Sequence, residues 1–393
     1  GSSGALRLSR QSPGVAESDV ADPGAATALI AGPAGALTAT PPTNARFIGA
    51  ADSTTTIVVG GNPGSVVLPD SDGTHSLVVR TTSNLTADRL LTFVPGDAAR
   101  TITITGDATF PQASSLNIVE GRCSLTSATP VTTADVTAAT TLYYALYRGN
   151  RIALYDGSAT WNVRTVAQLS IAVPATTNTM YDVFVDDTGG TPALEVVAWT
   201  NDTTRATALA TQDGVYVQTA DTDSRYVCSF RTTGVSGQTE DSMARRLVWN
   251  YYNRERRVLR FLTASGSWSY NTATWRQAEG SAANQVAAVI GVAEVSVSLI
   301  LAAAVQSDTA GTNFNVGIGI DSTTAVSAAA LFTGVFTARA NEVVPVASFL
   351  TTFPAIGYHT FTWLEWGTGG APSSTWRGTS VAVQAGLTGG IAG

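Results

Sequence analysis

Short apolar or alternating runs recur along the chain. They lie at residues 56–59, 65–68, 76–79, 101–105, 181–185, 194–199, 314–321 and 360–366. A period of two places successive side chains on opposite faces of a β-strand. Turn signals rich in Gly, Asn and Asp separate the runs, about every 8–12 residues in the carboxyl-terminal half, as in antiparallel sandwiches. The pattern therefore predicts an all-β fold.

Two neighbouring runs predict a hairpin. Residues 141–148 and 151–155 flank Gly149 and Asn150. A two-residue loop with glycine first suits a type II′ turn, which joins two antiparallel strands directly. We therefore expect these two strands to pair with each other.

Five other segments of the carboxyl-terminal half carry expectations. Residues 267–270 and 274–276 are expected to be partner strands, and residues 286–301 one or two buried strands. Residues 203–210 suit a short helical turn, because Asp and Thr favour its start. Residues 386–393 are half glycine, so we expect them to bury little.

Changes in composition divide the chain into three parts. Residues 1–45 are rich in Ala, Gly and Pro and show no strand or helix period, which predicts an extended N-terminal arm. The arm either orders along a partner as an anchor or remains a loose terminus. Residues 46–165 predict a β-rich stalk-like module. Residues 166–393, with longer runs, predict a distal jelly-roll-like β-sandwich.

The charge content narrows the class of protein. Charged residues make up 13% of the chain, about half the usual share, and the net charge is −7 without a single lysine. A negative chain is a poor general ligand for nucleic acid. Uncharged Thr and Val faces suit contacts between subunits, so we expect a homotrimer. Residues 286–304 form the longest apolar stretch, but Gly291 and Glu294 interrupt it, so no membrane insertion is expected.

Residues that commonly carry chemistry are sparse. His75 and His359 are the only histidines, and Gly317 and Gly319 lie within a strand pattern without a third glycine. Three carboxylate pairs, which a glycosidase could use, sit in turn-like sequence and are better interpreted as solvated loops: Asp186 and Asp187, Asp221 and Asp223, and Glu240 and Asp241. Asp70 to Gly73 resembles a fragment of a calcium loop without its distal Glu, and a turn is the better interpretation. We therefore predict no catalytic, cofactor or metal site, and no enzyme.

The two cysteines, Cys123 and Cys228, lie far apart and form no CxxC spacing. We expect them to be small apolar core residues rather than metal ligands or a disulfide framework.

Residues 249–280 concentrate aromatic and arginine side chains in a chain otherwise poor in charge. The candidates for recognition or for a subunit interface are Trp249, Tyr251, Tyr252, Arg254, Arg256, Arg257, Trp268 and Trp275. Their strand-like spacing favours a sheet core over a subunit interface, and an interface over a glycan site. The arginines from 254 to 260 interrupt two good strands, so we expect them in an exposed connection.

Two segments resemble virus proteins. Residues 84–93 and 97–107 are similar to a phrase found in bacteriophage tail-fibre proteins. Residues 181–184, 198–201, 231–234, 249–254 and 274–278 are similar, in that order, to virion proteins of tailed phages. The resemblance implies a structural protein of the virion, assembled in the cytoplasm of the bacterial host. It implies no functional residues.

The function expected from these observations is a fibre or spike. The arm would bind other virion proteins, and the distal domain would attach to a glycan of the host surface. Two alternatives remain: a head fibre or decoration protein bound to the capsid, and a spike that degrades polysaccharide.

Overall fold

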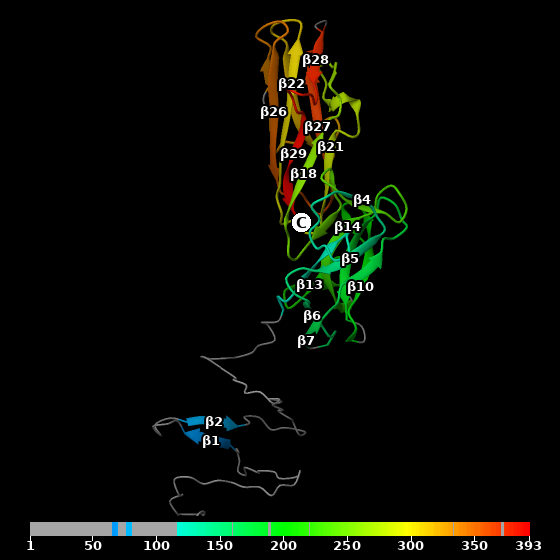
Figure 1. Cartoon of the computed structure of the whole chain (residues 1–393), viewed down its shortest axis with the longest axis vertical. Coiled ribbons are helices and arrows are strands. Elements are labelled where there is room, and N and C mark those ends of the chain that lie inside the picture. The colour runs from blue at the N-terminus through cyan, green and yellow to red at the C-terminus, as the bar shows by residue number, and fades with distance from the viewer. Residues whose placement is uncertain are drawn as a thin grey trace, which may run out of the picture. The chain divides into compact units, whose positions relative to one another are not determined.

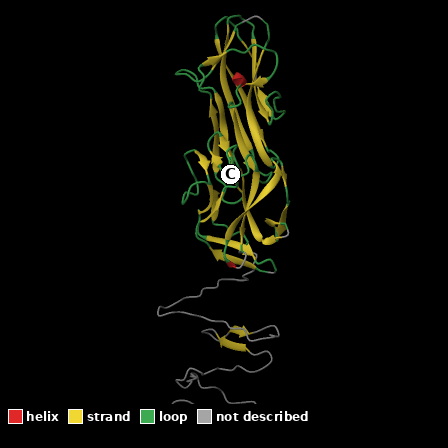
Figure 2. Cartoon of the chain, turned by 90° about the vertical axis from the view of Figure 1, so that its right-hand side faces the viewer, coloured by secondary structure: helices red, strands yellow, loops and turns green. Residues whose placement is uncertain are grey.

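The computed structural model describes residues 65–69, 76–80 and 116–393, except residues 159, 188–189, 220, 333 and 371–372. Apart from a 3-10 turn at Ala278–Gly280 (η3), every regular element in these residues is a β-strand, so the fold is all-β as predicted (Figures 1 and 2). The chain divides into two compact units, Gly1–Thr103 and Ile104–Gly393. The expected arm, the runs at 56–59 and 101–105, His75, the turn Asp70 to Asp72 and the segments at 84–93 and 97–107 lie outside the described residues.

The described part of the first unit is one pair of strands. β1 (Ser65–Pro69) and β2 (Ser76–Arg80) are antiparallel, with Ser65 opposite Arg80. Both strands were predicted from their apolar runs.

The second unit contains two lobes. The first lobe has a three-stranded sheet, a two-stranded sheet and a larger sheet, the β14 sheet, of order β11-β10-β9-β14-β13-β12 with β17 also on β14. Its strands are β3 (Gly121–Ser124), β5 (Thr141–Leu146), β6 (Arg151–Tyr155), β7 (Trp161–Thr165), β8 (Leu169–Ala172), β9 (Met180–Asp186), β10 (Ala193–Asn201), β11 (Thr204–Arg205), β12 (Leu209–Gln212), β13 (Val215–Gln218), β14 (Asp221–Arg231) and β17 (Val248–Asn250).

The second lobe is a two-layer sandwich. One layer, the β27 sheet, has the order β25-β23-β27-β21-β16-β15-β4 with β20 also on β27; the other, the β22 sheet, has the order β18-β29-β22-β26-β24 with β28 and β19 attached. The strands of the β27 sheet are β4 (Val136–Ala139), β15 (Thr239–Asp241), β16 (Arg245–Arg246), β20 (Arg276–Gln277), β21 (Gln285–Ile290), β23 (Asn313–Ile320), β25 (Gly334–Phe336) and β27 (Gly357–Gly367). Those of the β22 sheet are β18 (Arg256–Leu262), β19 (Ser267–Trp268), β22 (Val297–Ser307), β24 (Ala330–Phe332), β26 (Val343–Thr352), β28 (Ser374–Arg377) and β29 (Gly386–Ala392).

The β14 sheet is covered on both faces. Alternation along β9 directs Met180 and Phe184 into the core of the second lobe, and Tyr181 and Val183 into the core of the first. The two lobes therefore pack on opposite faces of the same sheet. β14 has a β-bulge between Tyr226 and Cys228, and the bulge changes the face of the sheet to which the following side chains point.

Two predicted pairings are wrong, although the strands themselves exist. β5 pairs with β3 and β8, and β6 pairs with β7, so the runs flanking Gly149 do not form a hairpin with each other. In the same way β19 pairs with β28, and β20 pairs with β27. A strand pairs with whichever strand lies beside it in the folded sheet. That neighbour can be distant in sequence, so the local turn residues do not specify it.

Two further predictions are wrong in type. Residues 203–210 contain the short strand β11 and the start of β12 instead of a helical turn. Residues 386–393 form β29, which lies between β18 and β22 and is largely buried. Glycine at position 389 lets the neighbouring strand approach β29 closely, since a Cβ there would lie 1.9 Å from the Ser298 carbonyl oxygen.

Residues on either side of position 165 share one core. Val119, Leu142 and Ile152 pack with Val183 and Phe230 in the first lobe. The described residues from 116 onward therefore belong with the part that was expected to begin at residue 166.

Candidate functional site

The aromatic and arginine stretch, residues 249–280, does not form one site. It starts in β17 of the first lobe, continues through β18 and β19 of the β22 sheet, and ends at β20 of the β27 sheet. Its side chains fall into two clusters and one pair of strand arginines.

The first cluster lies where the lobes meet. Trp249 is 1% exposed and belongs to the core of the second lobe. Tyr251 packs edge-on against Tyr216 and Tyr252, with ring centroids 5.3 and 4.7 Å apart. Arg254 lies over the Trp249 ring at 5.3 Å. The core interpretation of Trp249 is thus confirmed, and the neighbouring rings extend that core toward the first lobe.

The arginine of this cluster has partners within the chain. Arg254 Nε donates to the Tyr251 carbonyl at 3.0 Å, and its Nη2 forms an ion pair with Glu294. These bonds fix the orientation of the guanidinium over the Trp249 ring.

Tyr252 accepts a hydrogen bond from Arg225, which was not among the residues predicted from the sequence. Arg225, 1% exposed, donates to the carbonyl oxygens of Ala153 and Leu116 at 2.7 Å and to the Tyr252 hydroxyl at 3.0 Å. The available signal was an arginine directly before the apolar run Tyr226 to Cys228 of a strand. A buried guanidinium with carbonyl acceptors holds separate segments together.

Arg256 and Arg257 lie in β18, so the expected exposed connection is wrong. Because strand side chains alternate, Arg256 points outward while Arg257 is buried. Arg257 Nη2 donates to Asp241 Oδ2 at 2.7 Å, and its Nη1 donates to the Thr132 carbonyl at 2.7 Å. Arg246 holds the other oxygen of Asp241 at 2.9 Å.

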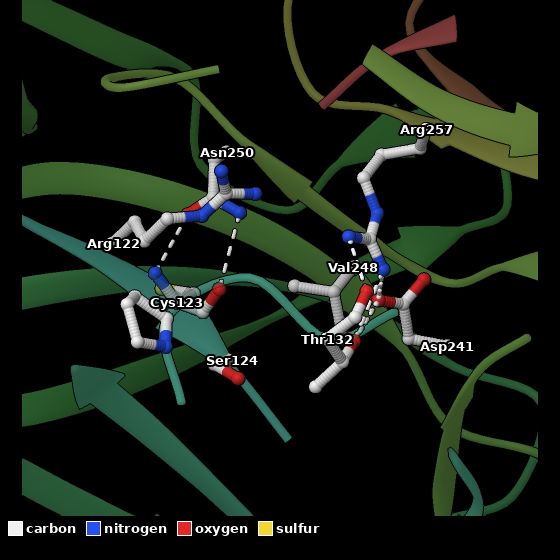
Figure 3. Close-up of a pocket in the computed structure, with 9 residues that line it drawn as sticks. Arg122, Cys123, Ser124, Thr132, Asp241, Val248, Asn250 and Arg257 are labelled. Carbon is white, nitrogen blue, oxygen red and sulfur yellow. Dashed lines mark hydrogen bonds and ion pairs between the residues drawn. The ribbon is translucent and has the colours of Figure 1, made fainter. Parts of the chain in front are cut away.

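A small recess lies beside Arg257, lined also by Arg122, Cys123, Ser124, Pro130, Thr132, Asp241, Val248 and Asn250 (Figure 3). The side chain of Asn250 closes one side, since its Oδ1 accepts from the Cys123 backbone N–H at 2.6 Å and its Nδ2 donates to the Cys123 carbonyl at 3.2 Å. The cavity volume is about 10 Å³, room for one water molecule and not for a sugar ring.

Cys123 is bonded to Cys228, which corrects the expectation of free apolar cysteines. The bond joins β3 to β14 across 105 residues of sequence. Spacing alone did not indicate it, because the two strands meet only through the packing of two sheets.

Arg122 points from the same recess toward the carboxyl terminus. Its Nη1 donates to the Asn253 carbonyl at 3.0 Å and its Nη2 to the Gly393 carbonyl at 2.9 Å. Burial, with the nearby charge of Arg257, lowers the pKa of Arg122 to about 10. The side chain therefore remains a cation at neutral pH.

The second cluster surrounds a buried carboxylate. Glu365 accepts from Trp268 Nε1 at 2.6 Å, from Arg276 Nε at 2.8 Å and from the Glu279 backbone N–H at 3.1 Å. Arg276 also lies over the Tyr270 ring at 3.7 Å. Burial raises the pKa of Glu365 to about 7, against the opposing effect of these donors and of the Arg276 charge. The arrangement orders Trp268 and Arg276 within the sandwich.

Trp275 lies beside this cluster. Its ring contacts Phe332 edge-on, with centroids 5.6 Å apart, and both side chains are partly exposed. Trp275, from residues 249–280, and Phe332, from β24, thus form a partly exposed aromatic pair.

The carboxylate pairs also have structural partners. Asp187 bonds Arg164 at 2.8 Å, and Glu240 bonds Arg245 at 3.0 Å. The pKa of Asp221 is raised to about 6 because its carboxyl hydrogen-bonds to that of Asp223, with burial and nearby carboxylates adding to the effect. Carboxyls in direct contact are closer than the roughly 5 Å or more that separates the pair of a glycosidase.

Both ring nitrogens of His359 have hydrogen-bond partners within the chain. His359 is buried, with Nδ1 2.7 Å from Asp321 Oδ2 and Nε2 3.0 Å from the Ala355 carbonyl. Burial alone lowers the pKa of His359, but the hydrogen bond and charge of Asp321 outweigh it and raise the pKa. Within the described residues, no three His, Cys, Asp or Glu side chains are grouped as a metal ion requires.

No protein-family model, no curated protein and no solved structure matches this chain. No helix in the part of the chain that the structure describes is long and apolar enough to cross a membrane.

Proposed function

We propose that the chain is a structural subunit of a fibre or spike on a tailed-phage virion, assembled as a homotrimer. The observation that carries this proposal is the way buried arginines connect the two lobes into one rigid body. Independent domains usually move against each other unless their interface is large and apolar. Here the shared apolar core is reinforced by three such connections.

The first connection is made by Arg122 of β3, which donates to the carbonyl oxygen of Gly393, the residue after β29. The second is Arg205, whose guanidinium bonds Asp182 at 2.6 Å and the Gly291 carbonyl at 2.7 Å. The third is Arg231, which bonds Asp202 at 2.8 Å and lies over the Tyr358 ring at 4.1 Å. Each guanidinium bonds or stacks on both lobes, so bending at the junction breaks charged contacts that water does not replace at the same geometry.

A rigid all-β body suits a part that carries load between a virus particle and a cell. The resemblance of residues 181–278 to virion proteins supports the same role. In this proposal residues 1–45 bind other virion proteins, and the second lobe meets the host surface. Trp275 and Phe332 supply ring faces of the kind on which sugar rings stack.

Immunogold labelling tests the proposal. An antibody raised against the full chain should label purified particles of the source virus at a fixed position on the tail or the head. Particles free of label, in preparations where a known coat protein is labelled, would remove the virion role.

Host attachment is tested separately with the purified chain. Trp275→Ala should weaken binding to host cells several-fold, while Trp161→Phe, which changes a buried ring of the first lobe, should leave it unchanged. Equal binding by both variants and the parent would remove Trp275 from the attachment surface.

A further inference from the structure

The β22 sheet has one face in the sandwich core and one face turned away from it. The cross-strand register aligns the outward side chains into rows. In one row Ile300 lies between Phe349 of β26 and Thr388 of β29, and Phe349 lies next to Leu331 of β24. Arg260 of β18 completes the row beside Thr388. We call the side of the sheet that carries this row the outer face.

The outer face is apolar where sheets facing water are usually polar. Ile300 is 44% exposed, Phe349 48% and Leu331 74%. β22 reads VSLILAAAVQS, a nearly continuous apolar run. A strand with one wet face alternates, whereas a strand covered on both faces is apolar throughout. The sequence of β22 is thus that of a strand with a second cover, which the described residues do not provide.

The size of the outer face fits a protein interface. Four strands (β18, β29, β22 and β26) spaced about 4.8 Å apart, over about seven residues rising about 3.4 Å each, span roughly 450 Å², and the three residues of β24 add to it. The longer β22 and β26 add to that area. Each partner of a standard interface contributes roughly 800 Å². Exposed apolar patches of several hundred Å² mark interaction sites.

Charge selects the kind of partner. The charged residues among the outward positions of the β22 sheet are Arg256 and Arg260 of the edge strand β18 and Arg377 of β28, which lies opposite Ala304; no ion pair is described for any of them. Three scattered cations do not make a surface for a polyanion. Depletion of charge at the centre, with arginine at the rim, is the composition of a protein interface.

The shape of the outer face indicates what covers it. The outward positions of β29 include Thr388 and Gly390. Their small side chains leave a shallow depression in the outer face along that strand. The outward positions of β26 and β24 include Phe349 and Leu331, whose large side chains project from the outer face. The low and high halves lie on opposite sides of β22, the central strand of the five.

We propose that a second copy of this chain covers the outer face, with the β26 and β24 half of one copy packed on the β29 and β18 half of the next. The high half and the low half of the same face complement each other between copies, and most soluble assemblies consist of identical chains. The arrangement also keeps the arginines of neighbouring copies apart, because each arginine edge meets an apolar edge. This inference rests on the proposed homotrimer and goes beyond it by naming the surface.

Light scattering of the full chain separates the two proposals. The parent should have about three times the chain mass of 40.5 kDa, and Ile300→Asp and Phe349→Asp should each reduce it to one chain mass. Val381→Asp is the matched control, because Val381 is fully exposed in the loop between β28 and β29 and should leave the mass unchanged. A monomeric parent overturns both the homotrimer and the interface. A parent oligomer that both variants leave intact overturns the interface alone.

An engineered pair of cysteines tests the same contact without disturbing the fold. Phe349 and Thr388 lie on either side of Ile300, two strand spacings or about 9.6 Å apart, beyond the roughly 6.8 Å limit for a disulfide. In Phe349→Cys/Thr388→Cys any new disulfide must therefore join two chains. Under mild oxidation we expect a covalent trimer on a non-reducing gel, and single chains from the control Val381→Cys/Thr388→Cys. Single chains from both variants overturn the contact.

Discussion

Arg122 Nη2 donates a hydrogen bond of 2.9 Å to the carbonyl oxygen of Gly393, 271 residues further along the chain. β3, near the start of the second unit, is thereby tied to the end of the β29 segment. The two residues belong to different lobes, so the bond closes the junction from one side while Arg205 and Arg231 close it elsewhere.

Arg122→Met should lower the free energy of unfolding by about 2–4 kcal/mol, because it removes the charged donor of the Asn253 carbonyl and leaves the Gly393 carbonyl with the Glu255 backbone N–H alone. Urea unfolding followed by tryptophan fluorescence measures the change. Arg148→Met is the control: that side chain is 63% exposed and pairs loosely with Glu255, so a change within about 0.5 kcal/mol is expected. Equal effects of the two substitutions would contradict the role assigned to Arg122.

Gly389→Ala should destabilise the chain by about 3 kcal/mol, since its Cβ meets a backbone carbonyl in the middle of a sheet and cannot move aside. Gly266→Ala, at a position with no atom within 4 Å of the added Cβ, should change stability by less than about 0.5 kcal/mol. Thermal unfolding of the two variants measures both. A Gly389→Ala chain as stable as the parent would mean that β29 does not run between β18 and β22.

Glu365→Gln should remove part of the dependence of stability on pH. The pKa of Glu365 is about 7 in the folded chain and near 4.5 when unfolded, so the folded state holds the proton more tightly. Its contribution is complete below about pH 4.5 and is lost as the pH rises to about 7, by at most about 3 kcal/mol. Unfolding free energies measured at several pH values between 4.5 and 8 should fall more steeply for the parent than for Glu365→Gln. Parallel profiles would show that burial does not raise this pKa.

Removal of the disulfide in Cys123→Ala/Cys228→Ala should cost about 4 kcal/mol, because the bond closes a loop of 105 residues in the unfolded chain. The intact parent should carry no titratable thiol after unfolding without a reductant, and two after reduction. Two free thiols in the unreduced parent would refute the pairing.

The strands that the sequence predicted correctly are those with a strong local pattern. Residues 181–185, 314–321 and 360–366 alternate, and each coincides with a strand that the structure describes, except that Asp321 follows the end of its strand. The segment at 286–301 was also recognised, as β21 and the first part of β22. Period-two alternation is a property of a single strand, so one strand suffices to reveal it.

The candidate site was predicted less completely. Trp249 was recognised as core, because aromatic residues at strand spacing usually pack inward. Arg122, Arg225 and Glu365 were not singled out, since each stands alone in its segment and acquires its partners from elsewhere in the chain. β29 was missed because glycine is a poor strand residue unless neighbouring backbones crowd the position.

The all-β class, the positions of most strands and the shortage of charge follow from the order of residues alone, because side-chain alternation and composition are local quantities. The partner of each strand, the bond between Cys123 and Cys228 and the burial of Arg257 beside exposed Arg256 followed only from the folded arrangement. A strand presents the same backbone donors and acceptors to any neighbour. Which neighbour a strand pairs with depends on contacts between side chains that can be a hundred residues or more apart in sequence. Those contacts form only when the sheets pack together.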